Sequence, residues 1–277
     1  MTVKEIQYTA QGGQHIVSIV EDGIVFVACR NMICAFERGK LIHTFKAHHI
    51  PESSLALAVL SEKKHLLSST QEETKIWDVS NPRQPTFITT TVLAGGQWAC
   101  TRSEKIHTSP TRDFVTVIGD LHANLIQKVG TVKLYTSPTT LFLLDQRGVV
   151  SFYQYPCQKT TRCYRIVPSI TAPISQIAAT DSTLAVCIGT RVKVFGISLP
   201  EHPMIHEFEI KPNQRIKAFG DIFATYNSSK IVFFDNYFKT KGVTLSVKVG
   251  EIVDLALAPQ RLFVLGTERT AIITFKT

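Results

Sequence analysis

The adjacent histidines His48 and His49 have side chains that could bind a metal ion. In an extended strand, however, neighbouring side chains point to opposite faces, so at most one of the two could reach a given ion. His202 and His206 lie on either side of Pro203, and this proline excludes the helical spacing that would place both on one face. The positions of these histidines therefore indicate structural or surface roles. We expect neither a metal nor another cofactor.

The sequence contains none of the short motifs that commonly indicate an enzyme. It lacks the G-x-S-x-G turn of a serine nucleophile, the H-E-x-x-H pair of a zinc protease, the G-x-x-x-x-G-K-[ST] phosphate loop and the G-x-G-x-x-G dinucleotide fingerprint. Gly95 and Gly96 are followed by no predicted helix whose N-terminus could help to bind a phosphate. We therefore expect a protein that is not an enzyme.

The cysteines indicate the compartment in which the chain works. None forms a C-x-x-C pair, and most lie in apolar, strand-like runs, which is a usual environment for a buried free thiol. No apolar run approaches the roughly 20 residues that cross a bilayer, and residues 1–20 lack an apolar signal core. Together these features predict a location in the cytoplasm or nucleus.

The hydrophobic pattern is that of an all-β protein. Apolar runs of four to eight residues, rich in Val, Ile, Phe and Thr, are separated every eight to twelve residues by Gly, Pro, Asn, Asp or Ser. Grouped in fours, these runs begin near residues 14, 54, 96, 131, 173, 214 and 251, a spacing of about 35 to 42 residues. The pattern predicts a single β-propeller domain over residues 1–277, with seven four-stranded blades.

The two ends of the chain fit such a ring. The seventh group has only three strands, at 252–257, 261–265 and 271–276, whereas an additional strand at 3–8 precedes the first complete group. If the N-terminal strand is the fourth strand of the last blade, the ring closes and only short, protected sheet edges remain. We therefore expect a seven-bladed β-propeller closed by an N-terminal strand that completes the last blade.

One blade has a recognisable family signature. Residues 66–78, which read LLSSTQEETKIWD, resemble the second half of a WD40 repeat. Residues 45–49, FKAHH, resemble the end of the fourth strand of such a repeat. Elsewhere only the strand rhythm matches, with aromatic residues where the tryptophan would stand. The chain is therefore similar to WD40-repeat β-propellers over its whole length as an architecture, and in one blade as a motif.

The resemblance implies structural roles for residues of that blade. In the family, a loop histidine, a strand serine, the tryptophan and a turn aspartate form a hydrogen-bonded set that stiffens the blade. The matching positions here are His48 or His49, Ser68 or Ser69, Trp77 and, in place of the aspartate, Glu72. The resemblance thus assigns these side chains to packing and hydrogen bonding, with no catalytic role.

The charge of the chain favours acidic partners. The 30 Lys and Arg residues against 22 Asp and Glu give a formal net charge of +8, although no block of five or six like charges forms a nucleic-acid-binding arm. In a propeller, the loops between the second and third strands share one face with the loops that lead to the next blade, and basic residues are in excess there. We expect this face to bind a partner through Arg30, Arg147, Arg191, Arg215 and Arg269.

The function expected from these features is a non-enzymatic scaffold that binds one or more proteins with an acidic or phosphorylated segment. An alternative is an RNA-associated propeller in a ribonucleoprotein particle, for which Tyr226, Tyr237 and Phe238 are the obvious loop aromatics. A further alternative is a phosphoinositide-binding propeller of the autophagy type. The Phe-Arg-Arg-Gly motif of that family is absent, so membrane binding is not expected.

Overall fold

The computed structural model describes residues 2–9, 13–19, 21–49, 55–91, 93, 97–101, 104–108, 114–118, 123–127, 131–137, 139–145, 148–154, 163–166, 174–199, 201–235 and 241–276. The chain divides into two compact units. The terminal unit comprises residues 1–98 and 246–277, and the middle unit comprises residues 99–245. That the whole chain forms one domain stays a prediction.

Three four-stranded sheets, named blades one, two and seven, lie in the terminal unit. Blade one consists of β2 (His15–Ile19), β3 (Ile24–Cys29), β4 (Met32–Glu37) and β5 (Lys40–Lys46). Blade two consists of β6 (Ala56–Leu60), β7 (His65–Ser69), β8 (Thr74–Asp78) and β9 (Thr86–Thr91). Blade seven consists of β26 (Ile252–Ala258), β27 (Arg261–Gly266), β28 (Thr270–Phe275) and β1 (Val3–Thr9).

Four further sheets, blades three to six, lie in the middle unit apart from the ends of β10 and β25 at its boundaries. Blade three consists of β10 (Gln97–Cys100), β11 (Lys105–Thr108), β12 (Phe114–Ile118) and β13 (Ala123–Gln127). Blade four consists of β14 (Thr131–Thr136), β15 (Thr140–Asp145), β16 (Val150–Gln154) and β17 (Cys163–Ile166). Blade five consists of β18 (Ile174–Ala179), β19 (Thr183–Ile188), β20 (Arg191–Gly196) and β21 (Met204–Glu209). Blade six consists of β22 (Arg215–Phe219), β23 (Ile222–Tyr226), β24 (Lys230–Phe234) and β25 (Lys241–Ser246).

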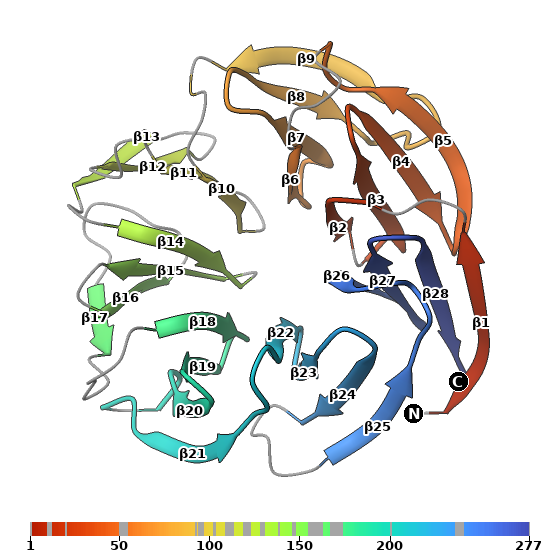
Figure 1. The fold of residues 1–277 in the computed structure, drawn as a ribbon. Helices are drawn as coiled ribbons and strands as arrows, with labels where there is room; N and C mark the ends of the chain where they lie inside the picture. Colours follow the sequence, from red (N-terminus) through yellow and green to blue (C-terminus); the bar gives the residue numbers. More distant parts are fainter. Residues whose placement is uncertain are drawn as a thin grey trace. The chain divides into compact units, whose positions relative to one another are not determined.

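The strand grouping follows the predicted repeat. The first strands of blades one to seven begin at residues 15, 56, 97, 131, 174, 215 and 252, within two residues of the predicted group starts. Consecutive strands pair as antiparallel neighbours, as in β3 with β4 and β19 with β20. Short turns join β3 to β4 and β19 to β20, as Figure 1 shows. A turn of a few residues is sufficient because antiparallel neighbours need no long crossover connection.

The hydrophobic core of each unit lies between neighbouring blades. Second strands such as β3, β15, β19 and β27 are buried along almost their whole length, so both of their faces are covered. Phe26 of blade one belongs to the same buried cluster as Leu66 of blade two. In the middle unit, Phe142 of blade four shares a cluster with Leu184 of blade five. A sheet with two apolar faces needs a packing partner on each face, so each blade depends on its neighbours.

The N-terminal strand belongs to the last blade. β1 pairs antiparallel with β28, with Ile6 opposite Ile273 and Tyr8 opposite Ala271, and Figure 1 shows the two strands side by side. The predicted pairing of this strand with the last blade is therefore confirmed. That the pairing closes a ring stays a prediction.

Two outer strands share a short sequence and a backbone irregularity. Residues 41–45 of β5 read LIHTF and residues 204–208 of β21 read MIHEF, so both contain Ile-His-x-Phe. In each strand the isoleucine, Ile42 or Ile205, is an extra residue that interrupts the register and forms a bulge. The histidine and phenylalanine rings stack in both, with centroids 5.9 Å apart in β5 and 5.7 Å apart in β21. The structure thus reveals a similarity between blades one and five that the sequence motif at residues 66–78 of blade two does not indicate.

Removal of residues 2–9 should destabilise the chain, because β28 would lose its outer neighbour and the half-buried Ile6 would lose its packing. We expect the free energy of unfolding to fall by about 2–4 kcal/mol, measured by urea denaturation. Two point variants provide a matched comparison: Ile6→Lys should lower the melting temperature, whereas Gln7→Lys, at an exposed neighbour, should not. Equal melting of the truncated and full chains would contradict the contribution of this strand.

Candidate functional site

A partly buried set of hydrogen-bonded side chains links blade two to the segment that follows blade one. Nε1 of Trp77 on β8 donates to Oγ of Ser68 on β7 at 2.9 Å. That hydroxyl lies 2.9 Å from Nε2 of His48, and Nδ1 of His48 lies 2.8 Å from Oε1 of Glu73. Because a carboxylate only accepts, His48 Nδ1 donates to Glu73, and Nε2 lies within hydrogen-bonding distance of both the hydroxyl and the backbone carbonyl of Ser68, at 2.9 and 3.1 Å. The four side chains fix one another in a chain.

Glu73 is the acidic end of this set. Its Oε1 also lies 3.1 Å from Nζ of Lys75, and the same ammonium donates to the carbonyl of Ala47 at 3.2 Å. Partial burial acts to raise the pKa of the Glu73 carboxyl, but hydrogen bonds from His48 and Lys75 outweigh it and hold the pKa below its usual value. The hydrogen bonds of Lys75 to Ala47 and of Glu73 to His48 therefore tie the β7–β8 turn to the segment that follows blade one.

The set includes one of the two candidate histidines and a glutamate that the sequence did not suggest. His48 is buried, whereas His49 is exposed. Glu73, and not Glu72, lies against the histidine, and Glu72 is exposed. The signal that could have identified it is Thr70, whose hydroxyl accepts from the backbone N–H of both glutamates at 3.2 and 3.1 Å. The turn that begins at Thr70 ends at Glu73 and directs the Glu73 side chain toward His48.

Trp77 also packs in an aromatic cluster between blades one and two. Its ring meets Phe45 of β5 edge-on at 5.0 Å between centroids, and Phe87 of β9 edge-on at 5.6 Å. In blade six, Phe234 at the end of β24 packs in the corresponding place on Phe208 of β21, but these two rings stack, with centroids 6.0 Å apart. A phenylalanine has no N–H to donate, so blade six has this aromatic packing without the tryptophan's hydrogen bond.

Two kinds of segment meet at the same end of the blades. Ala47 N, after β5, donates to the carbonyl of Asn31 in the β3–β4 turn at 2.9 Å. Ile210 N, after β21, donates to the carbonyl of Thr190 in the β19–β20 turn at 2.8 Å. The turns between second and third strands therefore lie beside the segments that precede the next blade, as the sequence analysis assumed. We define the loop face as these segments with the first residues of the strands that follow them. Its described residues are 30–31, 46–48, 70–75, 131–133, 145, 148, 189–191, 210–215, 227–230, 247–251 and 267–269.

The arginines predicted to bind a partner lie on separate blades, and the four that are described are exposed. Arg30 lies in the β3–β4 turn, Arg191 and Arg215 begin β20 and β22, and Arg269 lies in the β27–β28 turn. Arg147 lies outside the described residues. The structure therefore places four of the five on the loop face, two in each unit.

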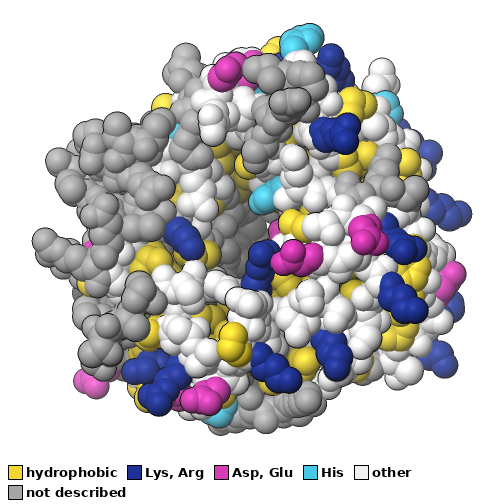
Figure 2. Space-filling model, in the orientation of Figure 1, with side chains coloured by type: hydrophobic (Ala, Val, Ile, Leu, Met, Phe, Trp, Pro, Cys, Tyr) yellow, Lys and Arg dark blue, Asp and Glu magenta, His cyan; other side chains and the backbone are white. Residues whose placement is uncertain are grey.

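The charge of the loop face differs between the two units. Figure 2 shows Lys and Arg side chains in dark blue across the face drawn, with magenta Asp and Glu side chains among them. In the middle unit the exposed basic residues of the loop face are Lys133, Arg191, Lys211, Arg215 and Lys230. The acidic residues at the same ends of the strands are Asp145 and Glu209. In the terminal unit, Arg30, Lys46, Lys248 and Arg269 lie among Glu72, Glu251 and Glu268. Among the described residues, the basic excess is therefore concentrated in the middle unit.

The ion pair between Arg191 and Glu209 in the middle unit leaves Arg191 accessible. Arg191 Nε lies 3.9 Å from Oε1 of Glu209, and the two side chains are 67% and 74% exposed. An exposed pair at this distance contributes little to stability and is easily replaced by another carboxylate. The arginine can therefore exchange this contact for a ligand.

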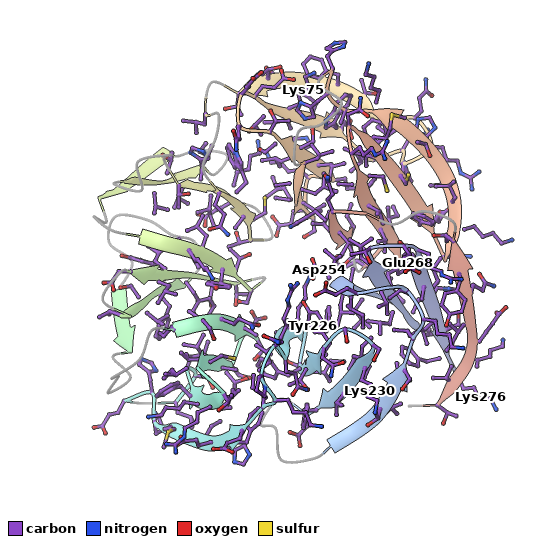
Figure 3. All side chains as sticks on the ribbon, viewed as in Figure 1. Lys75, Tyr226, Lys230, Asp254, Glu268 and Lys276 are labelled. Atoms are coloured by element: carbon purple, nitrogen blue, oxygen red, sulfur yellow. The ribbon has the colours of Figure 1, made fainter. Side chains whose placement is uncertain are left out.

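Aromatic side chains on the loop face differ from the sequence interpretation. Tyr226 is the last residue of β23 and only 5% exposed, so its assignment as a loop aromatic was wrong. Figure 3 labels it on blade six, together with Lys230. Tyr237 and Phe238 lie outside the described residues. In the terminal unit, Tyr8 is 43% exposed, and the guanidinium of Arg269 lies over its ring at 5.3 Å.

The described cysteines lack the features of a reactive thiol. Cys29, Cys34, Cys100 and Cys187 are free, as predicted. Burial raises the pKa of Cys100 and of Cys187 to about 12. A hydrogen bond between Cys29 and Cys34 raises the pKa of Cys29 and lowers that of Cys34 to about 7, but Cys34 is 1% exposed in the core between blades one and seven. A nucleophilic thiolate needs both charge and access, and none of the four combines them.

Metal-ligand clusters and membrane-spanning helices are both absent from the described part of the chain. There, no group of three or more His, Cys, Asp or Glu side chains could hold a metal ion. The described residues also include no helix long and apolar enough to cross a membrane.

Comparison with known proteins identifies the fold. No family model and no curated protein matches the chain. The solved structure of U3-55K is 15% identical, with a TM-score of 0.71 over 98% of each chain. The crystal structure of the RRP9 WD40 repeats is 14% identical, with a TM-score of 0.72 over 98% of each chain. The chain is similar to these proteins in fold, and the predicted all-β, seven-bladed β-propeller fold is confirmed.

Replacement of the central hydroxyl should destabilise the chain. Ser68→Ala leaves the Trp77 N–H without its acceptor at a fully buried position, so we expect a loss of about 1–3 kcal/mol in urea unfolding. Trp77→Phe keeps the aromatic packing and should cost about 1 kcal/mol. Ser246→Ala, at an exposed strand serine, is the matched control. If Ser68→Ala were as stable as this control, the hydrogen-bonded set would contribute nothing to stability.

The low pKa of Glu73 gives the chain a specific acid sensitivity. Because the folded-state pKa lies below the unfolded one, this carboxyl stabilises the fold above its ordinary pKa of about 4.3, and the contribution is lost as pH falls through the folded value. Glu73→Gln should therefore be less stable than wild type by roughly 1 kcal/mol at neutral pH, with the difference vanishing in acid. Glu72→Gln should show no such convergence, and parallel pH profiles for wild type and Glu73→Gln would contradict the assignment.

Proposed function

We propose that the protein is a non-enzymatic interaction scaffold that binds an acidic or phosphorylated segment of another protein. The observation that carries this proposal is the group of exposed basic side chains on the loop face of the middle unit, in blades five and six. The propeller fold supports it, because buried strands hold the loops while the loop side chains remain open to a ligand. Arg30, Arg147 and Arg269 are proposed as additional contacts.

The backbone around Arg215 is held in place by amide side chains. Gln176 of β18 accepts from Ile216 N at 2.9 Å and donates to the carbonyl of Gln214 at 3.4 Å. The Gln214 side chain in turn donates to Thr225 Oγ1 at 2.7 Å. The residues on both sides of Arg215 are therefore fixed against neighbouring strands. Such preorganisation lowers the entropy that a bound partner would have to offset.

The turns that carry Lys211 and Lys230 are similarly ordered. Lys211 N donates to Gln214 Oε1 at 3.0 Å. The Asn227 side chain accepts from the backbone N–H of Ser229 at 3.2 Å and of Lys230 at 2.9 Å. Local amide hydrogen bonds of this kind define a turn without help from a ligand. The basic side chains thus extend from formed turns and need no large rearrangement to bind.

Arginine and lysine would have different roles in such a site. The planar guanidinium groups of Arg191 and Arg215 can each offer two parallel N–H donors to a carboxylate or phosphate. The ammonium groups of Lys211 and Lys230 supply charge that attracts an acidic segment during its approach. Because all four are exposed, salt would screen them and weaken binding.

Charge reversal tests the location of the site. The triple variant Arg191→Glu/Lys211→Glu/Arg215→Glu should lose retention on an immobilised pool of serine-phosphorylated peptides. Wild type should be retained on that pool, and less on the same pool after phosphatase treatment. The matched control is Arg38→Glu/Lys40→Glu/Lys63→Glu, which changes the net charge equally at exposed residues outside the loop face. Equal retention of wild type and the first triple variant would contradict the proposed site.

A second candidate function is RNA binding, favoured by the net charge of +8 and by the half-exposed Tyr8 ring beneath Arg269. An aromatic ring with a guanidinium stacked on it can contact an unpaired base. Retention on single-stranded homopolymer RNA, a steep fall in affinity with salt and a loss on Tyr8→Ala would support this function. Retention on phosphopeptides that is insensitive to Tyr8→Ala would instead favour the peptide site.

A further inference from the structure

β9, the outer strand of blade two, has an exposed edge without charged residues. Five of its six residues are exposed, and Phe87 and Ile88 are 49% and 45% accessible. No Asp, Glu, Lys or Arg occurs between residues 84 and 101. Within the described residues, β9 has β8 as its one neighbouring strand. An outer edge of this composition is open to pairing with another strand.

Other outer strands carry the charges that normally prevent such pairing. β1 contains Lys4 and Glu5, β5 contains Lys40 and Lys46, β17 contains Arg165, β21 contains Glu207 and Glu209, and β25 contains Lys241. The side chains of β13 lie outside the described residues. Charged residues on an edge strand resist its addition to another sheet. β9 lacks this protection. The nearest charged residue before it, Arg83, forms an ion pair with Glu37 at 3.0 Å.

The register of β9 shows which part of it is available. Phe87 lies opposite Trp77 and packs on its ring, so this residue has a role within the blade. Ile88 is an extra residue that forms a bulge, whereas residues 89–91 pair regularly with β8. The three threonines at 89–91 therefore present a straight, uncharged edge. The exposed Ile88 flanks this edge.

We propose that β9 pairs antiparallel with β9 of a second copy of the chain, centred on Thr90. In this arrangement Thr89 faces the partner's Thr91 on each side of a two-fold axis, and the two Thr90 residues face each other. Threonine pairs are favourable across strands and no like charges meet. The same arrangement of β5 would place Lys40 opposite Lys46, which disfavours it. Because the edge is short, the interface is smaller than a standard one, and the dimer is weak and depends on concentration.

Sedimentation velocity over about 1 to 500 µM of the full chain tests the proposal. Wild type should shift from monomer to dimer over this range, whereas Thr90→Lys should remain monomeric because two charges would meet at the axis. Thr244→Lys is the matched control, since it introduces the same charge at an exposed threonine of the outer strand β25. The control should dimerise as wild type does.

A second variant tests the register of the β9–β9 pairing, and it keeps the proposal testable if Thr90→Lys fails to fold. Thr90→Cys should form a disulfide-linked dimer with its own copy under mild oxidation, and Thr244→Cys should form at least tenfold less. The bond requires the two β-carbons to lie within a few ångströms of each other, so it tests the pairing centre directly. Wild type that stays monomeric throughout the range, or equal cross-linking of the two cysteine variants, would overturn the proposal.

Discussion

The packing of one blade on the next is the interaction on which the rest of the structure depends. The second and third strands carry apolar residues on both faces, and each buried cluster draws residues from two blades, as Phe26 and Leu66 or Phe142 and Leu184 do. A four-stranded sheet of this kind cannot cover both faces by itself. The sequence of a blade is therefore constrained mainly to be apolar and strand-forming, which permits wide divergence while the fold is kept.

This constraint explains how a hydrogen-bonded set can reinforce one blade without being required in another. The set of His48, Ser68, Glu73 and Trp77 adds directional hydrogen bonds to a blade whose burial already supports it. Blade six obtains a similar aromatic contact from Phe208 and Phe234 without that set. The bonds are thus a local reinforcement, and blade six forms without the tryptophan's hydrogen bond. The fold is accordingly conserved at sequence identities of 14–15%.

Fold and site differ in how far the sequence predicts them. Strand rhythm and turn residues located the seven groups to within two residues, because apolar strand runs and tight turns leave a direct trace in the chain. Side-chain contacts leave no such trace. The choice of Glu73 over Glu72 depends on a threonine turn, and Tyr226 is buried because it is still part of β23 and not of the loop that follows. The bulge at Ile88 and the charge difference between the units required coordinates, since both depend on register and on exposure.

The most direct test of the central claim is to map where a bound acidic segment lies, by hydrogen–deuterium exchange of the full chain with and without a retained phosphopeptide. If the basic loop face of the middle unit is the site, protection should appear at residues 189–191, 211–215 and 227–230. The turns at 38–40 and 61–64, outside the loop face, should exchange as in the free chain. Protection confined to those turns, or none at 189–191 and 211–215, would contradict the proposed scaffold function at this site.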